Sequence, residues 1–390
     1  MSNDTGAGSQ VVGIVAGEPS GDQLGAHLMR ALLKRESGLR FVGIGGPKME
    51  AAGCEVLFPM EKLAVRGYVE VIKHYWEIVG IRRRLRRHFI KNPPAVFIGI
   101  DAPDFNLGLE LDLRRAGIPT VQYVAPAVWA WRRQRIHTVK RAVSQLLTLF
   151  PFEAQLFEKI GVPVNYVGHP LADMLETLPP ITAVREALRL SPHIPVVALL
   201  PGSRVSELEN MAELFVRTAV KLSERVPGIR FLVPFATRET RDLFELAMAK
   251  VLPEDFNLTL MTGHALEAMA AADAVLVASG TATLEAALLK RPMVITYKVS
   301  KLSYWLLRGR AYQPFLGLPN ILAGEAIVPE LIQDAATPDT LAEALLVLLH
   351  DKDVRSRLDD RFETIRSSLR QGTADKAANA ILPLLSSGIA

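Results

Sequence analysis

The sequence predicts an α/β protein with two doubly wound parallel sheets and a cleft between the two domains. Short runs of consecutive apolar, β-forming residues, such as Val11–Ala16, alternate with helical segments along the chain. Consecutive apolar residues are typical of parallel strands that helices cover on both faces. The alternation occurs in two series, separated by the proline-containing stretch Gly168–Thr182. The length of 390 residues also exceeds what a single hydrophobic core ordinarily holds.

The elements follow in order from this pattern. The first series begins with the strand Val11–Ala16, a loop over Gly17–Gly21 and a helix over Asp22–Glu36. Its further strands are expected at Phe41–Ile44, Glu55–Phe58, Ala95–Ile100, Thr120–Val124 and Gln145–Thr148. The second series has expected strands at Val196–Leu200, Phe231–Pro234, Leu258–Met261, Val275–Ala278 and Met293–Tyr297. We therefore expect one domain over residues 1–170, a second over 171–350, and C-terminal helices over 351–390.

The composition is typical of a globular protein, with 49% hydrophobic and 22% charged residues. The N-terminus has no basic region followed by an apolar core, which argues against secretion. The longest uncharged run, Ala116–Trp131, is too short and too interrupted by prolines to span a bilayer. A single cysteine, Cys54, cannot form an internal disulfide or, alone, a cysteine-based zinc site. We expect a cytoplasmic protein.

The positive charge is concentrated in one segment, Val65–Lys91. This segment carries a net charge of +6 whereas the whole chain carries +4, so the remainder is slightly acidic and a uniformly basic nucleic-acid binder is disfavoured. Apolar residues at near-helical spacing precede an arginine cluster there, a pattern typical of a helix on an anionic membrane surface. A core-facing helix with a solvated basic end fits the same pattern. The candidate membrane contacts are Val69, Ile72, Trp76, Val79, Arg82, Arg83 and Arg84.

The stretch Val275–Lys298 is typical of a site for a nucleoside diphosphate. A strand leads into Ser279, Gly280, Thr281 and Ala282, which are small enough for the backbone to approach a phosphate, and a helix is expected from Thr281. The unpaired N–H groups of that helix would face the anion. Glu285, one turn later, can accept hydrogen bonds from both ribose hydroxyls. Small residues also occur at ordinary turns between a strand and a helix, so a purely structural role remains an alternative.

Two turns of the first domain carry candidate ligand or catalytic residues. The turn at Ala16–Gly25 contains Glu18, Ser20 and Gly21, which suit an anionic or sugar ligand, or else a helix start capped by Ser20 or Asp22. Asp101 comes directly after a buried strand, where a partly desolvated carboxylate can act as a general base. Its alternative role is a carboxylate held by neighbouring backbone N–H groups.

Two turns of the second domain complete the set. Ser203 and Arg204 follow a strand, and the guanidinium can bind a diphosphate through two hydrogen bonds, or else pair with Glu207 or Glu209. Asn320 brings an amide to a loop that follows the nucleotide stretch.

Six motifs in this order resemble one known family. They are GEPSGD, IGIDAPDFN, YVAPAVWAWR, LPGSR, ASGTATLE and LPNILAG. In these motifs the chain resembles the lipid A disaccharide synthases. Members of that family are inverting glycosyltransferases of the GT-B fold, which has two Rossmann-like domains. The resemblance extends from about Val11 to Gln333. Among the motifs, YVAPAVWAWR and IGIDAPDFN are specific to this family, whereas ASGTATLE is shared with other UDP-sugar transferases.

The resemblance implies a reaction and a set of roles. The enzyme would transfer the acylated sugar of UDP-2,3-diacylglucosamine to the 6-hydroxyl of 2,3-diacylglucosamine 1-phosphate. The product would be a β-1,6-linked disaccharide, which a Gram-negative bacterium uses in the synthesis of lipopolysaccharide. Asp101 would take the proton from the acceptor, while Arg204 and the residues Ser279–Ala282 would stabilise the departing UDP. Glu285 would hold the ribose, and Asn320 and Glu18 match family positions at the cleft. No metal and no cofactor is implied.

The resemblance also bears on partners and location. Because both substrates carry acyl chains, an enzyme without an anchor must reach them at the bilayer, which favours peripheral contact on the cytoplasmic face of the inner membrane. The C-terminal helices would return to the first domain, as in other GT-B chains, or exchange between subunits of a homo-oligomer. A soluble UDP-sugar epimerase of the same fold and a non-catalytic basic membrane-binding protein remain alternatives.

Overall fold

The computed structural model describes residues 10–63, 68–128, 135–175, 180–252, 256–299 and 314–387, without the side chains of residues 68–74 and 387. The chain divides into two compact units. Unit 1 comprises Met1–Asp173 together with Leu369–Ala390, and unit 2 comprises Met174–Ser368. The chain therefore passes from one unit to the other twice.

Unit 1 is built on a parallel sheet. Its described strands follow the order β3-β2-β1-β4-β5-β6-β7, so the direction of winding reverses between the neighbours β1 and β4. The central strands consist almost entirely of buried apolar residues, as expected for a sheet covered on both faces. The strands are β1 (Val11–Ala16), β2 (Arg40–Gly45), β3 (Cys54–Pro59), β4 (Val96–Ile100), β5 (Thr120–Tyr123), β6 (Gln145–Thr148) and β7 (Val164–Tyr166).

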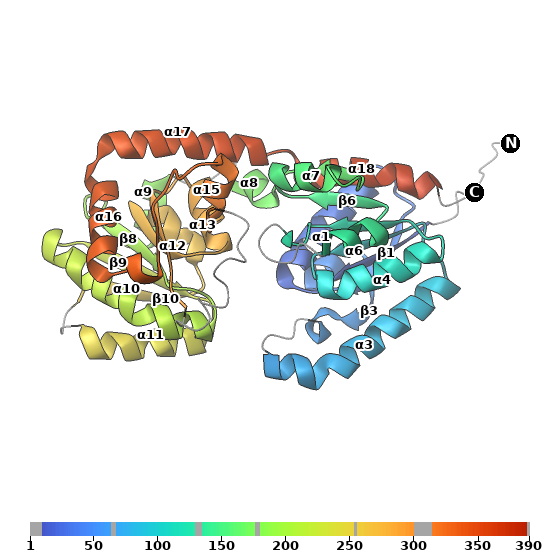
Figure 1. Ribbon diagram of the computed structural model, residues 1–390, viewed down its shortest axis with the longest axis horizontal. Helices are drawn as coiled ribbons and strands as arrows, with labels where there is room; N and C mark the ends of the chain where they lie inside the picture. Colours follow the sequence, from blue (N-terminus) through green and yellow to red (C-terminus); the bar gives the residue numbers. More distant parts are fainter. Residues whose placement is uncertain are drawn as a thin grey trace. The chain divides into compact units, whose positions relative to one another are not determined.

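Helices cover both faces of this sheet. One layer contains α1 (Pro19–Leu33), α2 (Pro47–Ala51) and α18 (Thr373–Ser387), and α18 lies along α1 although more than 300 residues separate them (Figure 1). The other layer contains α3 (Tyr68–Lys91), α4 (Pro103–Arg115) and α6 (Arg135–Ala142), with α4 between the other two. The remaining described elements of unit 1 are η1 (Met60–Lys62), α7 (Pro151–Glu158) and α8 (Pro170–Met174).

Unit 2 repeats the same plan with a second parallel sheet. The described strands follow the order β10-β9-β8-β11-β12-β13, and the winding reverses between β8 and β11. The strands are β8 (Val196–Leu200), β9 (Arg230–Phe235), β10 (Leu258–Thr262), β11 (Ala274–Ala278), β12 (Met293–Tyr297) and β13 (Glu330–Ile332).

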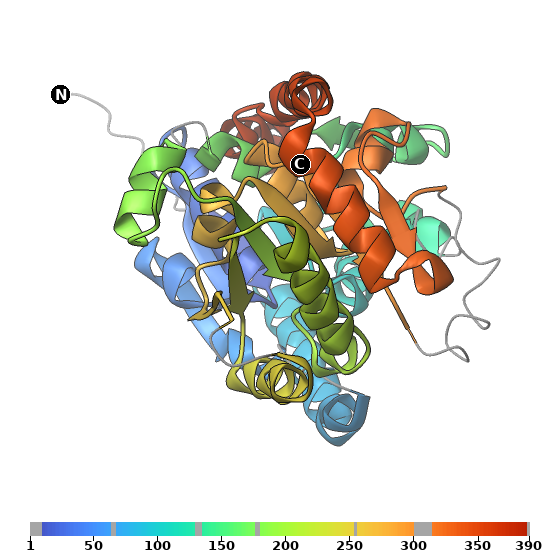
Figure 2. The ribbon, with the colours of Figure 1, turned by 90° about the vertical axis from the view of Figure 1, so that its left-hand side faces the viewer.

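The helices of unit 2 also form two layers. In one layer α10 (Val205–Arg225) lies between α11 (Arg238–Val251) and α16 (Pro338–His350), which Figure 2 shows from the end of the unit. The other layer contains α9 (Ile181–Ala187), α12 (Ala265–Ala271) and α13 (Thr281–Leu288). The remaining described elements are α15 (Leu318–Ala323), η3 (Gln333–Ala335) and α17 (Lys352–Leu369).

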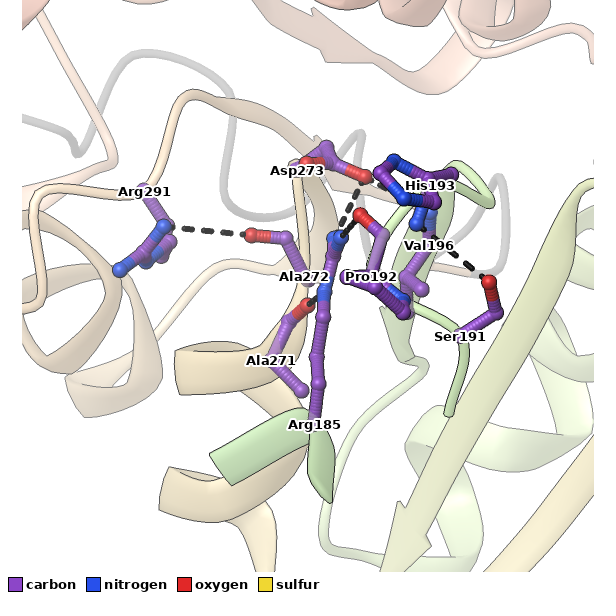
Figure 3. Close-up of polar contacts among 9 residues, drawn as sticks. All are labelled: Arg185, Ser191, Pro192, His193, Val196, Ala271, Ala272, Asp273 and Arg291. Carbon is purple, nitrogen blue, oxygen red and sulfur yellow. Dashed lines mark hydrogen bonds and ion pairs between the residues drawn. The ribbon is translucent and has the colours of Figure 1, made fainter. Parts of the chain in front are cut away.

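A buried ion pair ties α9 to the amino ends of two central strands of unit 2. Arg185 lies 2.7 Å from Asp273, and its other guanidinium nitrogens donate to the carbonyl oxygens of Ala271 and Pro192 (Figure 3). Asp273 also accepts the N–H of Val196, the first residue of β8, at 2.8 Å. Every nitrogen of this guanidinium therefore has a partner, as a buried charge requires.

The structure differs from the sequence-based expectation at several boundaries. The loop expected over Gly17–Gly21 is wrong from its third residue, because α1 begins at Pro19, whose fixed φ suits the first turn of a helix. The short strands β7 and β13 were not expected from the sequence. The stretch Gly168–Thr182 contains α8 and the start of α9.

Candidate active site

In unit 1 the candidate residues gather where the winding reverses. Ala16 at the end of β1 is the register partner of Ile100 at the end of β4. The loops that follow them, with Glu18 and Asp101, therefore leave the same edge of the sheet side by side. Ligands of doubly wound sheets bind at such a point, because neighbouring loops diverge to opposite faces there.

Asp101 has a constrained backbone and a perturbed carboxylate. Its φ of 51° and that of Ala102, 41°, lie in the left-handed region that non-glycine residues rarely adopt. Burial raises the pKa of Asp101 above its ordinary value, the negative charge of Glu18 raises it further, and a hydrogen bond from the Ala102 N–H opposes both effects. A carboxylate with a raised pKa at this edge is suited to accept a proton.

The other residues of the first turn have separate roles. Glu18 and Ser20 are exposed, whereas Gly21 is buried against the end of β4, where a Cβ would lie 3.5 Å from the Ile100 side chain. The alternative in which Ser20 or Asp22 caps this helix is wrong, since Glu18 occupies the N-cap position. Asp22 instead accepts the N–H groups of Gly46, Lys48 and Met49 and so caps α2.

Unit 2 has a matching edge after β8 and β11. Leu200 and Val277 are register partners, so the turn with Ser203 and Arg204 lies next to the start of α13. Glu207 accepts the backbone N–H groups of Ser203 and Arg204 at 2.9 and 3.2 Å and thereby shapes this turn. A Cβ at Gly202 would lie 2.6 Å from Glu207, which explains the glycine.

Arg204 is available to a ligand. Its side chain is 78% exposed, and its Nη1 lies 3.4 Å from Oε1 of Glu207. The ion pair with Glu207 that the sequence allowed is therefore present but weak. An exposed pair of this length contributes little to stability, roughly 0 to 1 kcal/mol, and a ligand anion can compete for the guanidinium.

The start of α13 has the geometry of an anion site. Gly280 is the N-cap, with φ 153° and no side-chain cap, and a Cβ there would meet no atom within 4 Å. Thr281 is exposed and Ala282 half-buried, so the first helical N–H groups lie at an open edge. Ser279 donates its hydroxyl to the Leu316 carbonyl at 3.2 Å. Burial raises the pKa of Glu285 above its ordinary value.

Asn320 is fully buried, and both ends of its amide are occupied. Its nitrogen donates to the Val328 carbonyl and to Glu330, and its oxygen accepts the N–H groups of Ile327 and Val328. Glu330 in turn accepts the N–H groups of Leu316 and Gly317. Asn320 therefore holds the loop segments around the start of α13, and a contact with a ligand would require one of these bonds to break.

The basic helix α3 presents different faces to the core and to solvent. Ile81, Leu85 and Phe89 are buried in the core of unit 1, and the guanidinium of Arg82 lies over Gly108 of α4. Trp76 is 74% exposed, Val79 is half-buried, and Arg83 and Arg84 are exposed. The side chains of Val69 and Ile72 lie outside those described. None of the described helices has the length and apolar content needed to cross a membrane.

Several side-chain contacts at these edges were not predicted from the sequence. Glu207 and Glu330 shape the loops of unit 2, and Tyr297 at the end of β12 lies close enough to Glu207 and Arg204 for both charges to affect its pKa, which burial raises. Asn106 and Gln122 support Asp101 in unit 1. Asn106 lies within the motif IGIDAPDFN and Tyr297 within the stretch Val275–Lys298, and Glu207 was considered only as an ion-pair partner of Arg204. Among the described residues, no group of three His, Cys, Asp or Glu side chains is placed to hold a metal ion.

A family model and similar relatives found for this chain agree on its family. The family model described as lipid-A-disaccharide synthetase matches residues 12–383. The chain belongs to the lipid-A-disaccharide synthetase family. Two relatives named lipid-A-disaccharide synthase, from Azoarcus sp. (strain BH72) and Methylobacillus flagellatus, are 54% and 53% identical to it. The first match covers 96% of each chain, and the second covers 96% of this chain and 99% of the relative.

Solved structures show the fold of this lipid-A-disaccharide synthetase family member. The calicheamicin glycosyltransferase CalG4 is similar with a TM-score of 0.61 and 17% identity, over 98% of this chain and all of that one. A UDP-GlcNAc 2-epimerase from Neisseria meningitidis has a TM-score of 0.64 and 11% identity, over 97% and 99% of the two chains. The expected GT-B fold of two Rossmann-like sheets is confirmed, as is the expected family.

Proposed function

We propose that this chain condenses UDP-2,3-diacylglucosamine with 2,3-diacylglucosamine 1-phosphate. The products are the β-1,6-linked disaccharide 1-phosphate that precedes lipid A, and UDP. The observation that carries this proposal is the family match over residues 12–383, together with a carboxylate of raised pKa in unit 1 and an open helix start in unit 2.

In unit 1, Asp101 is the proposed general base. Its carboxylate accepts the proton of the acceptor's 6-hydroxyl while the hydroxyl oxygen bonds to the anomeric carbon and the bond from that carbon to UDP breaks. General base catalysis of this kind typically contributes about 10²–10⁴-fold to the rate. Glu18 and Ser20 are exposed at the same edge and are proposed to contact the acceptor, whereas Gly21 is buried and is proposed to act indirectly, by letting α1 lie close to the end of β4.

In unit 2, the proposed donor site is formed by two neighbouring turns. Arg204 and the N–H groups at the start of α13 supply positive charge for the diphosphate, and this charge stabilises UDP as it leaves. Ser203 and Ser279 lie at the same turns, and Glu285 is proposed to accept the ribose hydroxyls. Asn320 is proposed to act indirectly, through the backbone that it holds. We propose that the transfer needs no metal ion.

We also propose that α3 contacts anionic lipid on the cytoplasmic face of the inner membrane. Trp76, Arg83 and Arg87 are spaced by seven and four residues, so they share one helical face, and all three are exposed. An exposed tryptophan beside arginines is the combination that binds at the headgroup level. Acylated substrates would be reached from that position.

The test of the reaction is turnover of both substrates in detergent micelles that contain EDTA, with mass spectrometry of UDP and lipid. We expect a disaccharide monophosphate from the native chain and none from Asp101→Asn, with UDP binding unchanged. Release of UDP without disaccharide would contradict the acceptor assignment, and UDP-sugar isomerisation without an acceptor would indicate the epimerase instead.

The membrane contact predicts a change in lipid binding when the face of α3 is altered. A chain with Trp76→Ser, Arg83→Glu and Arg87→Glu should lose sedimentation with phosphatidylglycerol vesicles, since each arginine contributes about 1 kcal/mol near an anionic surface. Turnover in detergent should change little. Leu246→Ser with Arg238→Glu and Lys250→Glu is the matched control, because it makes the same change of charge at three exposed side chains of α11. Equal loss in both variants would argue against a specific contact.

A further inference from the structure

Three polar side chains lie behind Asp101 in the interior of unit 1. Asn106, Glu110 and Gln122 have no exposed surface. They converge at Gly99, because Gln122 is the register partner of Gly99. A Cβ at Gly99 would lie 2.2 Å from Oε1 of Glu110 and 2.9 Å from Cγ of Asn106. Because Gly99 has no side chain, there is space beside it for the three polar side chains to meet.

The nitrogens of the two amides hold the backbone of Asp101. Nδ2 of Asn106 donates to the Asp101 carbonyl oxygen at 2.9 Å, and Nε2 of Gln122 donates to the same oxygen at 3.0 Å. Nε2 of Gln122 also donates to the carbonyl of Val124, at 3.1 Å. Asp101 and Val124 both have a left-handed backbone, with φ 51° and 79°. The two amides therefore fix the turns at the ends of β4 and β5.

The side-chain oxygens of these three residues have no hydrogen-bond donor among the described residues. Oδ1 of Asn106, Oε1 of Gln122 and both carboxyl oxygens of Glu110 are buried, with no hydrogen-bond partner among the described residues. If Glu110 were ionised, its charge would attract the amide nitrogens and pull them away from Asp101. A neutral carboxyl has an O–H that an amide oxygen can accept. Burial raises the pKa of Glu110 well above its ordinary value, which agrees with the neutral form.

We propose that Glu110 is a positioning residue that acts as a neutral carboxylic acid. Its O–H donates to one of the two amide oxygens, keeps the amide nitrogens directed at the Asp101 carbonyl, and so sets where the Asp101 carboxylate lies. This inference rests on the proposed function, in which Asp101 takes the acceptor proton.

Two substitutions separate the donor from the charge. Glu110→Gln keeps a neutral donor of the same shape, whereas Glu110→Leu removes the donor and leaves both amide oxygens unpaired. We expect Glu110→Gln to retain kcat within about threefold, and Glu110→Leu to lose about 10–100-fold in kcat, as for a misplaced catalytic group. KM for both substrates should change little, because Glu110 lies outside the proposed substrate contacts.

The outcomes distinguish this inference from the proposed function. If native protein forms no disaccharide, the proposed function fails, whatever Glu110 does. If native protein is active and folded Glu110→Leu is equally active, or if Glu110→Gln is as impaired as Glu110→Leu, the inference is overturned. A purely structural role would lower thermal stability in Glu110→Leu without lowering kcat of the folded protein.

A spectroscopic measurement keeps the inference testable if Glu110→Leu does not fold. The infrared spectrum of native protein at neutral pH should contain the carbonyl band of a buried un-ionised carboxylic acid, and Glu110→Gln should lack it. Absence of a difference in that band between the two proteins would overturn the inference, independently of any activity.

Discussion

The carboxylate of Asp101 is electrostatically coupled to one neighbour in its own unit. Burial and the charge of Glu18 both raise its pKa. A general base must be ionised, so turnover should fall as the pH drops through this raised pKa. The two loops that bring the carboxylates together follow β1 and β4, and their meeting depends on the order of strands in the sheet.

Replacement of Glu18 by glutamine removes the like charge and should lower the pKa of Asp101. The acid limb of the kcat profile should therefore move to lower pH, whatever happens to the maximum rate. The measurement is a pH profile of disaccharide formation at saturating substrates. Glu224→Gln, an exposed position on α10, is the control. A limb that stays in place or moves to higher pH would contradict the coupling.

Residue types at the site could be predicted from the sequence, but their partners could not. Asp101 directly follows the buried strand β4, and Arg204 lies in the turn that follows the buried strand β8. The carboxyl ends of parallel strands lie at one edge of the sheet, where ligands bind. In contrast, the carboxylate of Asp22 caps α2, which begins more than 24 residues later in the sequence, and the amide oxygen of Asn320 accepts the backbone N–H of Val328. The convergence of Glu110 and Gln122 on Gly99 depends on the register of β4 and β5. Such contacts leave no local pattern in the chain.

At the scale of elements, long apolar strands were predictable and short edge strands were not. The strand expected at Val196–Leu200 is observed with the same bounds, because five consecutive apolar residues indicate a buried parallel strand. β7 and β13 have three residues each and are not fully buried, so their apolar signal is weak. The sequence pattern placed the start of α1 three residues too late, because glycines and a proline at Gly17–Gly21 are typical of a loop, whereas the helix begins at Pro19.

The buried pair of Arg185 and Asp273 predicts a large stability change in unit 2. Arg185→Met leaves the carboxylate of Asp273 partly buried without its cation, and loss of one partner of a buried pair costs about 3–5 kcal/mol. Urea unfolding should show this loss, and amide exchange in β8 and β11 should accelerate with it. Arg217→Met, which breaks an exposed pair with Glu213, should cost about 0.5 kcal/mol or less. Similar effects of the two changes would contradict the structural role.

At the scale of the whole molecule, unit 2 is one continuous segment placed inside the sequence of unit 1. Unit 1 needs its C-terminal part, because Ala377, Ala378, Ile381 and Leu385 of α18 belong to its core. Asp173, the last residue of unit 1 before unit 2, accepts the N–H groups of Gln371, Gly372 and Thr373. The two points at which the chain changes units are thereby fastened together.

This arrangement predicts different behaviour for the two halves when they are produced separately. Residues 174–368 should fold alone with a cooperative thermal transition, because their core is complete. Residues 1–173 should not, since the absence of α18 exposes the apolar surface of α1. Circular dichroism and calorimetry of the two fragments check this. Addition of a peptide of residues 369–390 should restore a transition to fragment 1–173, and a stable fragment without that peptide would contradict the expectation.

The split of unit 1 also bears on how the protein is made. Ribosomes release the chain from its N-terminus, and domains generally fold as they emerge. Here the strands of unit 1 emerge first, but the helix that closes their core is among the last segments synthesised. Unit 1 therefore waits with an uncovered apolar face while the whole of unit 2 is synthesised, until the ribosome has read nearly the whole message. A chaperone would therefore be most needed while the N-terminal half of the chain has left the ribosome and α18 has not yet been synthesised.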